Sequence, residues 1–250
     1  MASTSILVRV QAKGGKFIGP DAGYSQVTLK QADTGEVLAQ GTASGGSGNL
    51  LAAFVPSATR APVVTTQASG AQSLLWLSAM PPTIPPAAGF VATLDLDAPL
   101  LVSFTADALT DGAPNGHSVT ETMWVSPGAD LTAEPGMVLV IPGLIVKVLT
   151  ATVSGSELTV TAWVSMMCGC KIDPTLPWLP TEFAVTATIT DATGQQVAQT
   201  ALAYQTTSTF GTSSPIALPS GSGTYTVTVT AVQPAEANVG SAETSVSVSG

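Results

Sequence analysis

Apolar and polar residues alternate with a period of two through much of this chain. In the clearest segments every second residue is apolar, and the residues between are mostly threonine or alanine. These segments contain Phe90, Ala92, Leu94 and Leu96, then Leu158, Val160, Ala162 and Val164, then Phe183, Val185, Ala187 and Ile189, and finally Tyr225, Val227, Val229 and Ala231. A strand with one buried face has this pattern. Because no stretch of a dozen residues has helical periodicity, we predict an all-β protein.

Turn-forming residues separate these segments at regular intervals, for example at Asp33-Thr34-Gly35 and at Ala192-Thr193-Gly194. Short strands with this spacing predict β-sandwiches. From Leu144 to the end we expect roughly seven strands in about a hundred residues, which is the complement of an immunoglobulin-like sandwich. We therefore predict two tandem immunoglobulin-like antiparallel β-sandwich domains. The first spans residues 1–143 and has long Gly/Pro-rich loops, and the second spans residues 144–250.

The most apolar run of the chain extends from Met137 to Leu149 and is interrupted by Pro142-Gly143 and Lys147. It has about half to two-thirds of the length that a membrane-spanning helix needs. We interpret it as two buried strands that meet at a bend, and we expect no membrane span.

One hairpin resembles a known module. Val27–Leu29, the turn and strand Asp33–Leu38, and Gly41-Thr42 resemble the hairpin of carboxypeptidase-regulatory-like and transthyretin-like modules. The C-terminal half is similar to a generic bacterial immunoglobulin-like domain. Both families are mostly structural or binding modules, so the resemblance implies a β-sandwich with a structural or binding role.

The charge balance excludes some partners. Only 9% of the residues are charged, and the formal net charge is -9. Seven basic residues form no patch, and a net negative protein repels phosphate backbones and anionic lipid heads. We therefore expect no nucleic-acid partner.

No signal peptide is visible in this chain, which predicts a cytoplasmic protein as given, or a secreted or surface-associated one if a signal was removed. Two cysteines cannot form a dense disulfide framework, so the cysteine content does not indicate whether the protein is intracellular or secreted.

The sequence Met166-Met167-Cys168-Gly169-Cys170 gathers both cysteines of the chain. If the preceding strand continues through it, Met166, Cys168 and Cys170 share one face. Three interpretations follow. The thiols could form a strained, reducible disulfide, or, with Met166, bind a soft metal such as copper or zinc, or fill a core.

A catalytic alternative needs a partner for the thiols. His117 is the only histidine, and in an extended strand it shares a side with Glu121 and Met123. A cysteine nucleophile would pair Cys168 or Cys170 with His117 in a cleft between the domains, with Lys171 lowering the thiol pKa. The competing interpretation is a solvated histidine. For Trp76, Trp124, Trp163 and Trp178 we expect core packing rather than sugar stacking.

Our leading hypothesis is a non-enzymatic structural or ligand-binding protein, and the alternative is a cysteine-dependent enzyme or redox protein. Few charges protect the edge strands, so we also expect a protein partner or a homo-oligomer. The candidate surfaces are the loop Pro81–Pro86 and an exposed strand edge.

Overall fold

Strands dominate the computed structural model, which describes residues 2–46, 87–110, 113–133, 135–219 and 223–248. Strands account for 66% of this part and helices for 5%, so the all-β prediction is confirmed. The helical residues form short turns such as η1 (Pro20–Ala22), η3 (Pro180–Glu182) and η4 (Pro234–Glu236). Within the described ranges, no helix has the length and apolar character needed to cross a bilayer.

The chain divides into two units. Unit 1 consists of Met1–Pro142 and Met167–Gly169, and unit 2 consists of Gly143–Met166 and Cys170–Gly250. The predicted boundary at Gly143 did not anticipate that Met167–Gly169 group with unit 1. That each half folds as an independent domain stays a prediction.

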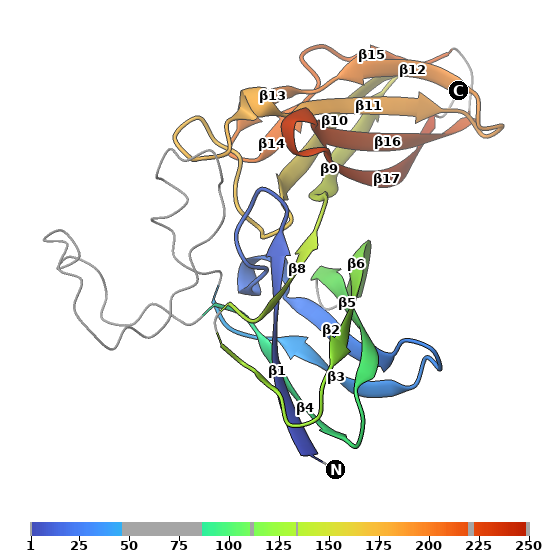
Figure 1. The fold of residues 1–250 in the computed structure, drawn as a ribbon. Helices are drawn as coiled ribbons and strands as arrows, with labels where there is room; N and C mark the ends of the chain where they lie inside the picture. Colours follow the sequence, from blue (N-terminus) through green and yellow to red (C-terminus); the bar gives the residue numbers. More distant parts are fainter. Residues whose placement is uncertain (1, 47–86, 111–112, 134, 220–222, 249–250) are drawn as a thin grey trace, which may run out of the picture. The chain divides into compact units, whose positions relative to one another are not determined.

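Unit 1 contains two sheets (Figure 1). In one sheet β1 lies between β4 on one side and β7 and β8 on the other, and the second sheet has the order β3-β2-β5-β6. Contacts of β3 with β4 and of β6 with β8 join the two sheets. The strands are β1 (Ala2–Ala12), β2 (Ser25–Gln31), β3 (Val37–Ala43), β4 (Phe90–Leu96), β5 (Leu100–Thr110), β6 (Ala113–Val125), β7 (Asp130–Leu131) and β8 (Met137–Ile141).

The first strand of unit 1 has mixed neighbours. β1 pairs antiparallel with β4 but parallel with β7 and β8, for example through Val8 and Met137. Unit 1 therefore departs from a purely antiparallel sandwich. Parallel strands need a long crossover connection, and here the intervening chain forms the whole second sheet. The predicted hairpin at Asp33-Thr34-Gly35 joins β2 to β3.

Unit 2 has the strand order of an immunoglobulin-like sandwich. β9 pairs along β10, and β14 and β15 pair with successive parts of β10, so they are two pieces of one strand on its other edge. Across one sheet β9, β10, β14 and β13 take the A, B, E and D positions, and across the other β11, β16 and β17 take C, F and G, with β12 beside β11. The strands are β9 (Leu144–Ser154), β10 (Glu157–Met166), β11 (Ala184–Thr190), β12 (Gln196–Ala201), β13 (Ala203–Thr206), β14 (Thr209–Gly211), β15 (Ile216–Ala217), β16 (Gly223–Gln233) and β17 (Asn238–Val248).

The core of unit 2 follows the period-two pattern. Val185, Ala187 and Ile189 of β11 are buried, whereas the threonines between them are partly exposed. Their buried partners on β16 include Val227 and Val229. The prediction of buried strands fails at β9, where Leu149 is 52% exposed. β9 is an edge strand of its sheet, so residues on its outer face meet solvent.

Candidate functional site

The cysteine segment is a tight turn rather than a continued strand. β10 ends at Met166, whose amide N–H donates to the carbonyl of Cys170 at 3.1 Å. Gly169 has a φ of 75°, a conformation that favours glycine, and Ser165 forms an isolated bridge with Lys171. The chain therefore reverses through Met167–Gly169. The expected shared face of Met166, Cys168 and Cys170 is wrong, because it required the strand to continue.

The sulfur atoms of this turn are buried. Cys168 is 0% exposed and Cys170 is 8% exposed, and neither forms a disulfide. Within unit 1, a Cβ built on Gly15 would lie 3.1 Å from Sγ of Cys168, so the thiol packs directly on the Gly15 backbone. A Cβ on Gly169 would lie 2.6 Å from the Asp21 backbone. Both glycines are needed for the close approach of these chain segments.

In the described part of the chain, the sulfurs have no cluster of His, Cys, Asp or Glu around them. Among the residues described, no three His, Cys, Asp or Glu side chains are placed to hold one ion. The neighbour of Met167 Sδ is the amide of Asn115, whose Nδ2 donates at 3.5 Å. The soft-metal hypothesis for Met166, Cys168 and Cys170 therefore loses the geometric argument on which it depended.

His117 is half-exposed and hydrogen-bonded to the backbone. It lies on β6, and its ring donates a hydrogen bond to the carbonyl of Pro142. Burial lowers the pKa of His117 below its ordinary value, and the Pro142 bond opposes this shift in part. It is Asn115, two residues earlier, that contacts the cysteine turn. Lys171 is exposed. A pairing of His117 with Cys168 or Cys170 stays a prediction.

The loop after the cysteines is fixed by Asp173. Its carboxylate accepts hydrogen bonds from the hydroxyls of Thr207 at 2.5 Å, Tyr204 at 3.2 Å and Thr175 at 2.8 Å. These bonds, that from Thr207 foremost, lower the pKa of Asp173 to about 2. The Asp173 amide donates to the carbonyl of Trp178, which is buried. The loop is therefore a packed closure with Trp178 inside it, as core packing predicts.

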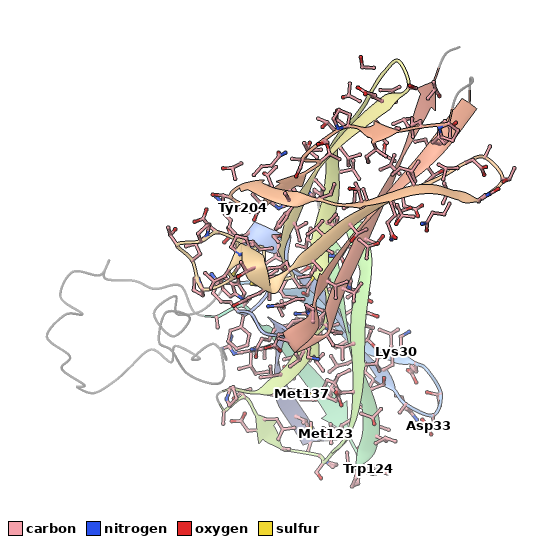
Figure 2. All side chains as sticks on the ribbon, turned by 90° about the horizontal axis from the view of Figure 1, so that it is seen from above. Lys30, Asp33, Met123, Trp124, Met137 and Tyr204 are labelled. Carbon is pink, nitrogen blue, oxygen red and sulfur yellow. The ribbon has the colours of Figure 1, made fainter. Side chains whose placement is uncertain are left out.

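Sequence reasoning misplaced Trp124, which is 67% exposed. It lies near the end of β6, with Met123 beside it, in the part of unit 1 that also holds Lys30 and Asp33 (Figure 2). A signal was present in the sequence: Val119, Met123 and Val125 are apolar at alternate positions, and Trp124 falls on the opposite side of the strand. Trp163 is partly exposed. Trp76 and the loop Pro81–Pro86 lie outside the described residues.

Comparisons with known proteins give fold-level likeness alone. No protein-family model matches the chain, and no curated protein sequence matches it. The structure resembles the chicken interferon gamma receptor alpha chain, with 11% identity, coverage of 100% of this chain and 98% of the receptor chain, and a TM-score of 0.33. It also resembles a tetra-tandem repeat from the extending region of a large adhesion protein, with 16% identity, coverage of 98% and 50%, and a TM-score of 0.29.

Neither likeness bears on function. The strand order of unit 2 places the chain among proteins built from immunoglobulin-like β-sandwich modules. No specific family is indicated.

Proposed function

We propose that this chain is a non-enzymatic binding module, in which unit 1 presents a contact surface and the cysteine turn serves packing. The observation that carries the proposal is the exposure of Trp124 on an edge strand. Large aromatic side chains are enriched at protein interfaces, where they act as anchors. Tryptophan is among the residues most enriched at the centres of interfaces, which favours a contact with another molecule at this position.

The packing of the thiols supports the same proposal. A cysteine nucleophile needs an accessible thiolate, whereas Cys168 is wholly buried against Gly15. Buried cysteine behaves as a small apolar side chain, which suits this contact.

Two measurements test the proposal. Replacing Trp124 with threonine should change the free energy of unfolding by less than about 0.5 kcal/mol, because exposed side chains contribute little to folding. A loss of several times that amount would show that Trp124 serves stability. Trp178→Thr is the matched control and should destabilise by about 3 kcal/mol or more, because Trp178 is buried.

The rate of alkylation of the folded protein, measured as a function of pH, tests whether the thiols are reactive. We expect Cys168 and Cys170 to resist the reagent until the protein is unfolded. Rapid reaction of either thiol well below a pH of about 8.5, the ordinary pKa of cysteine, would favour the cysteine-dependent alternative.

A further inference from the structure

The edge of the second sheet of unit 1 is long and lies beside the exposed tryptophan. β6 has 13 residues and stands at the end of the order β3-β2-β5-β6. In the part of the chain that the structure describes, β5 is the strand paired with β6, from Thr110 opposite Ala113 to Leu100 opposite Val125. In an antiparallel ladder about half of the backbone groups of an edge strand point away from its partner. β6 therefore offers a row of donors and acceptors to an added strand.

The side chains of β6 do little to block such an addition. Soluble proteins commonly protect edges with lysine, proline inside the strand or strong twist. β6 contains no lysine, its proline, Pro114, is the second residue of the strand, and Glu121 is its acidic residue. Its outward positions are Ser118, Thr120, Thr122 and Trp124, all exposed. The face beside the edge is thus a threonine surface that ends in one large aromatic ring.

The exposed surface of unit 1 is acidic overall. Trp124 pairs with Leu101, and the carbonyl of Leu101 accepts the amide of Ala32, which places Asp33 at the same end of the sheet. Within the described residues of unit 1, one lysine is exposed, Lys30, on the same outer face. The exposed carboxylates of unit 1 in those ranges are Asp21, Asp33, Glu36, Asp95, Asp97, Glu121 and Asp130. The field of this unit therefore attracts cations.

We propose that β6 binds an extended cationic polypeptide segment as an additional strand. This inference rests on the proposed function and names the partner class. Backbone hydrogen bonds to the edge provide affinity for any extended segment. Trp124 selects arginine or lysine by cation–π contact. Alternation of basic and threonine-like residues in the partner places the basic side chains on the face of Trp124, because only alternate side chains reach one face. Glu121 pairs with Phe104 and lies on the other face.

The test uses the full chain and defined peptides of about ten residues, long enough to span most of an edge strand. The probe alternates arginine with threonine. A second peptide has the same charge but has a proline inserted after every arginine–threonine pair, so that proline falls on both edges of the strand and the ladder cannot form. A third replaces arginine with glutamine. Calorimetry gives the affinities, and hydrogen exchange reports protection of the β6 amides.

We expect the arginine–threonine peptide to bind about tenfold or more tightly than either control peptide, and to slow exchange in β6. Trp124→Thr should weaken it several-fold, whereas Glu121→Gln should weaken it less, because Glu121 is on the other face of β6. Val91→Thr is the matched variant, since Val91 is 58% exposed on β4 in the other sheet, and it should bind as the unmodified protein does.

Equal binding of the proline peptide would show charge attraction without strand addition and would overturn the proposal. Equal binding of the glutamine peptide would overturn it, because the partner would then not need positive charge. Binding of a neutral oligosaccharide that is lost in Trp124→Thr, or a dimer in sedimentation that is lost in Trp124→Thr, would overturn it by showing a different occupant. If Trp124→Thr leaves stability unchanged and the thiols stay inert but no peptide binds, this inference fails while the proposed function stands. Loss of stability in Trp124→Thr would instead remove the proposed function.

Discussion

The thiol of Cys168 packs on the backbone of Gly15, which is 153 positions earlier in the chain. A Cβ at Gly15 would lie 3.1 Å from Sγ of Cys168 and 3.0 Å from Cβ of Ala12. A side chain at Gly15 and the thiol therefore compete for the same space.

Gly15→Ala should lower the free energy of unfolding by about 1 to 3 kcal/mol, because overpacking of a filled site is destabilising. In a Cys168→Ala background the same change should cost about 1 kcal/mol less, since the added methyl group takes part of the space left by Sγ. Urea unfolding of the four proteins measures this coupling. Gly223→Ala is the control, because a Cβ there has its nearest neighbour at 3.7 Å. Additive losses at Gly15 and Cys168 would contradict the contact.

Asn238 holds the first residue of unit 2. Its Oδ1 accepts the amide of Gly143 at 2.9 Å, and its Nδ2 donates to Gln233 at 3.0 Å, with all of these groups buried. Asn238→Ala leaves the partners without these bonds, so we expect a loss of about 2 to 4 kcal/mol, because each unsatisfied buried group costs about 1 to 3 kcal/mol. Gln199→Ala breaks an exposed hydrogen bond to Thr188 and should change stability by under about 0.5 kcal/mol. Similar thermal midpoints for the two variants would count against the role of Asn238.

Asp173 should make unit 2 sensitive to strong acid. Its pKa is lowered to about 2 in the folded protein, chiefly by the hydroxyl of Thr207. A lowered carboxyl pKa means that the contribution to stability is present above the unfolded value of about 3.9 and is lost as the pH falls through about 2. The difference in thermal midpoint between the unmodified protein and Asp173→Asn should therefore be constant from neutral pH down to about 4.5 and shrink below about 4. A difference that does not change with pH would show that the carboxylate charge is not involved.

Cutting the chain at the predicted boundary should affect the halves unequally. A fragment of residues 1–142 lacks Met167–Gly169, which group with unit 1 and pack on Gly15 and Asp21. We expect this fragment to unfold at lower urea concentration than unit 1 does in the full chain, because the buried surfaces beneath the missing turn become exposed. Hydrogen exchange of the β1 and β5 amides at increasing urea concentration measures the midpoint of unit 1 in the fragment and in the full chain. Identical midpoints in the fragment and the full chain would show that the turn adds nothing to unit 1.

The sequence predicted the strands better than it predicted the sites. Alternation placed Val185, Ala187 and Ile189 in a core, because an apolar face must be buried whichever strands pair with it. The same alternation puts Trp124 on the solvent face, opposite to Val125. The prediction was wrong because it followed the general preference of tryptophan for the core instead of this alternation. Leu149 was misjudged for a different reason: exposure of β9 depends on its place at the edge of a sheet, which one strand's sequence does not reveal.

The prediction of the candidate site was wrong because of one residue, Gly169. Treating Cys168-Gly169-Cys170 as extended chain put both thiols on one face, whereas Gly169 adopts a positive φ and reverses the direction. Glycine between two strands of alternating residues is a turn signal, and the pattern Met166 to Lys171 fits a three-residue hairpin loop ended by a left-handed glycine. The long-range partner Gly15 had no signal in the local sequence, because packing between distant segments is fixed by the fold.

The membership of Met167–Gly169 has a consequence for how the protein is made. Synthesis begins at the N-terminus, so Met1–Pro142 leaves the ribosome first, and Gly143–Met166 must follow before the last piece of unit 1 exists. Until then the nascent unit is incomplete at Gly15 and Asp21 and has apolar surface open to other chains. Ribosome stalling within β9 or β10 would prolong that state, and so codons far downstream influence whether the N-terminal half reaches its native packing.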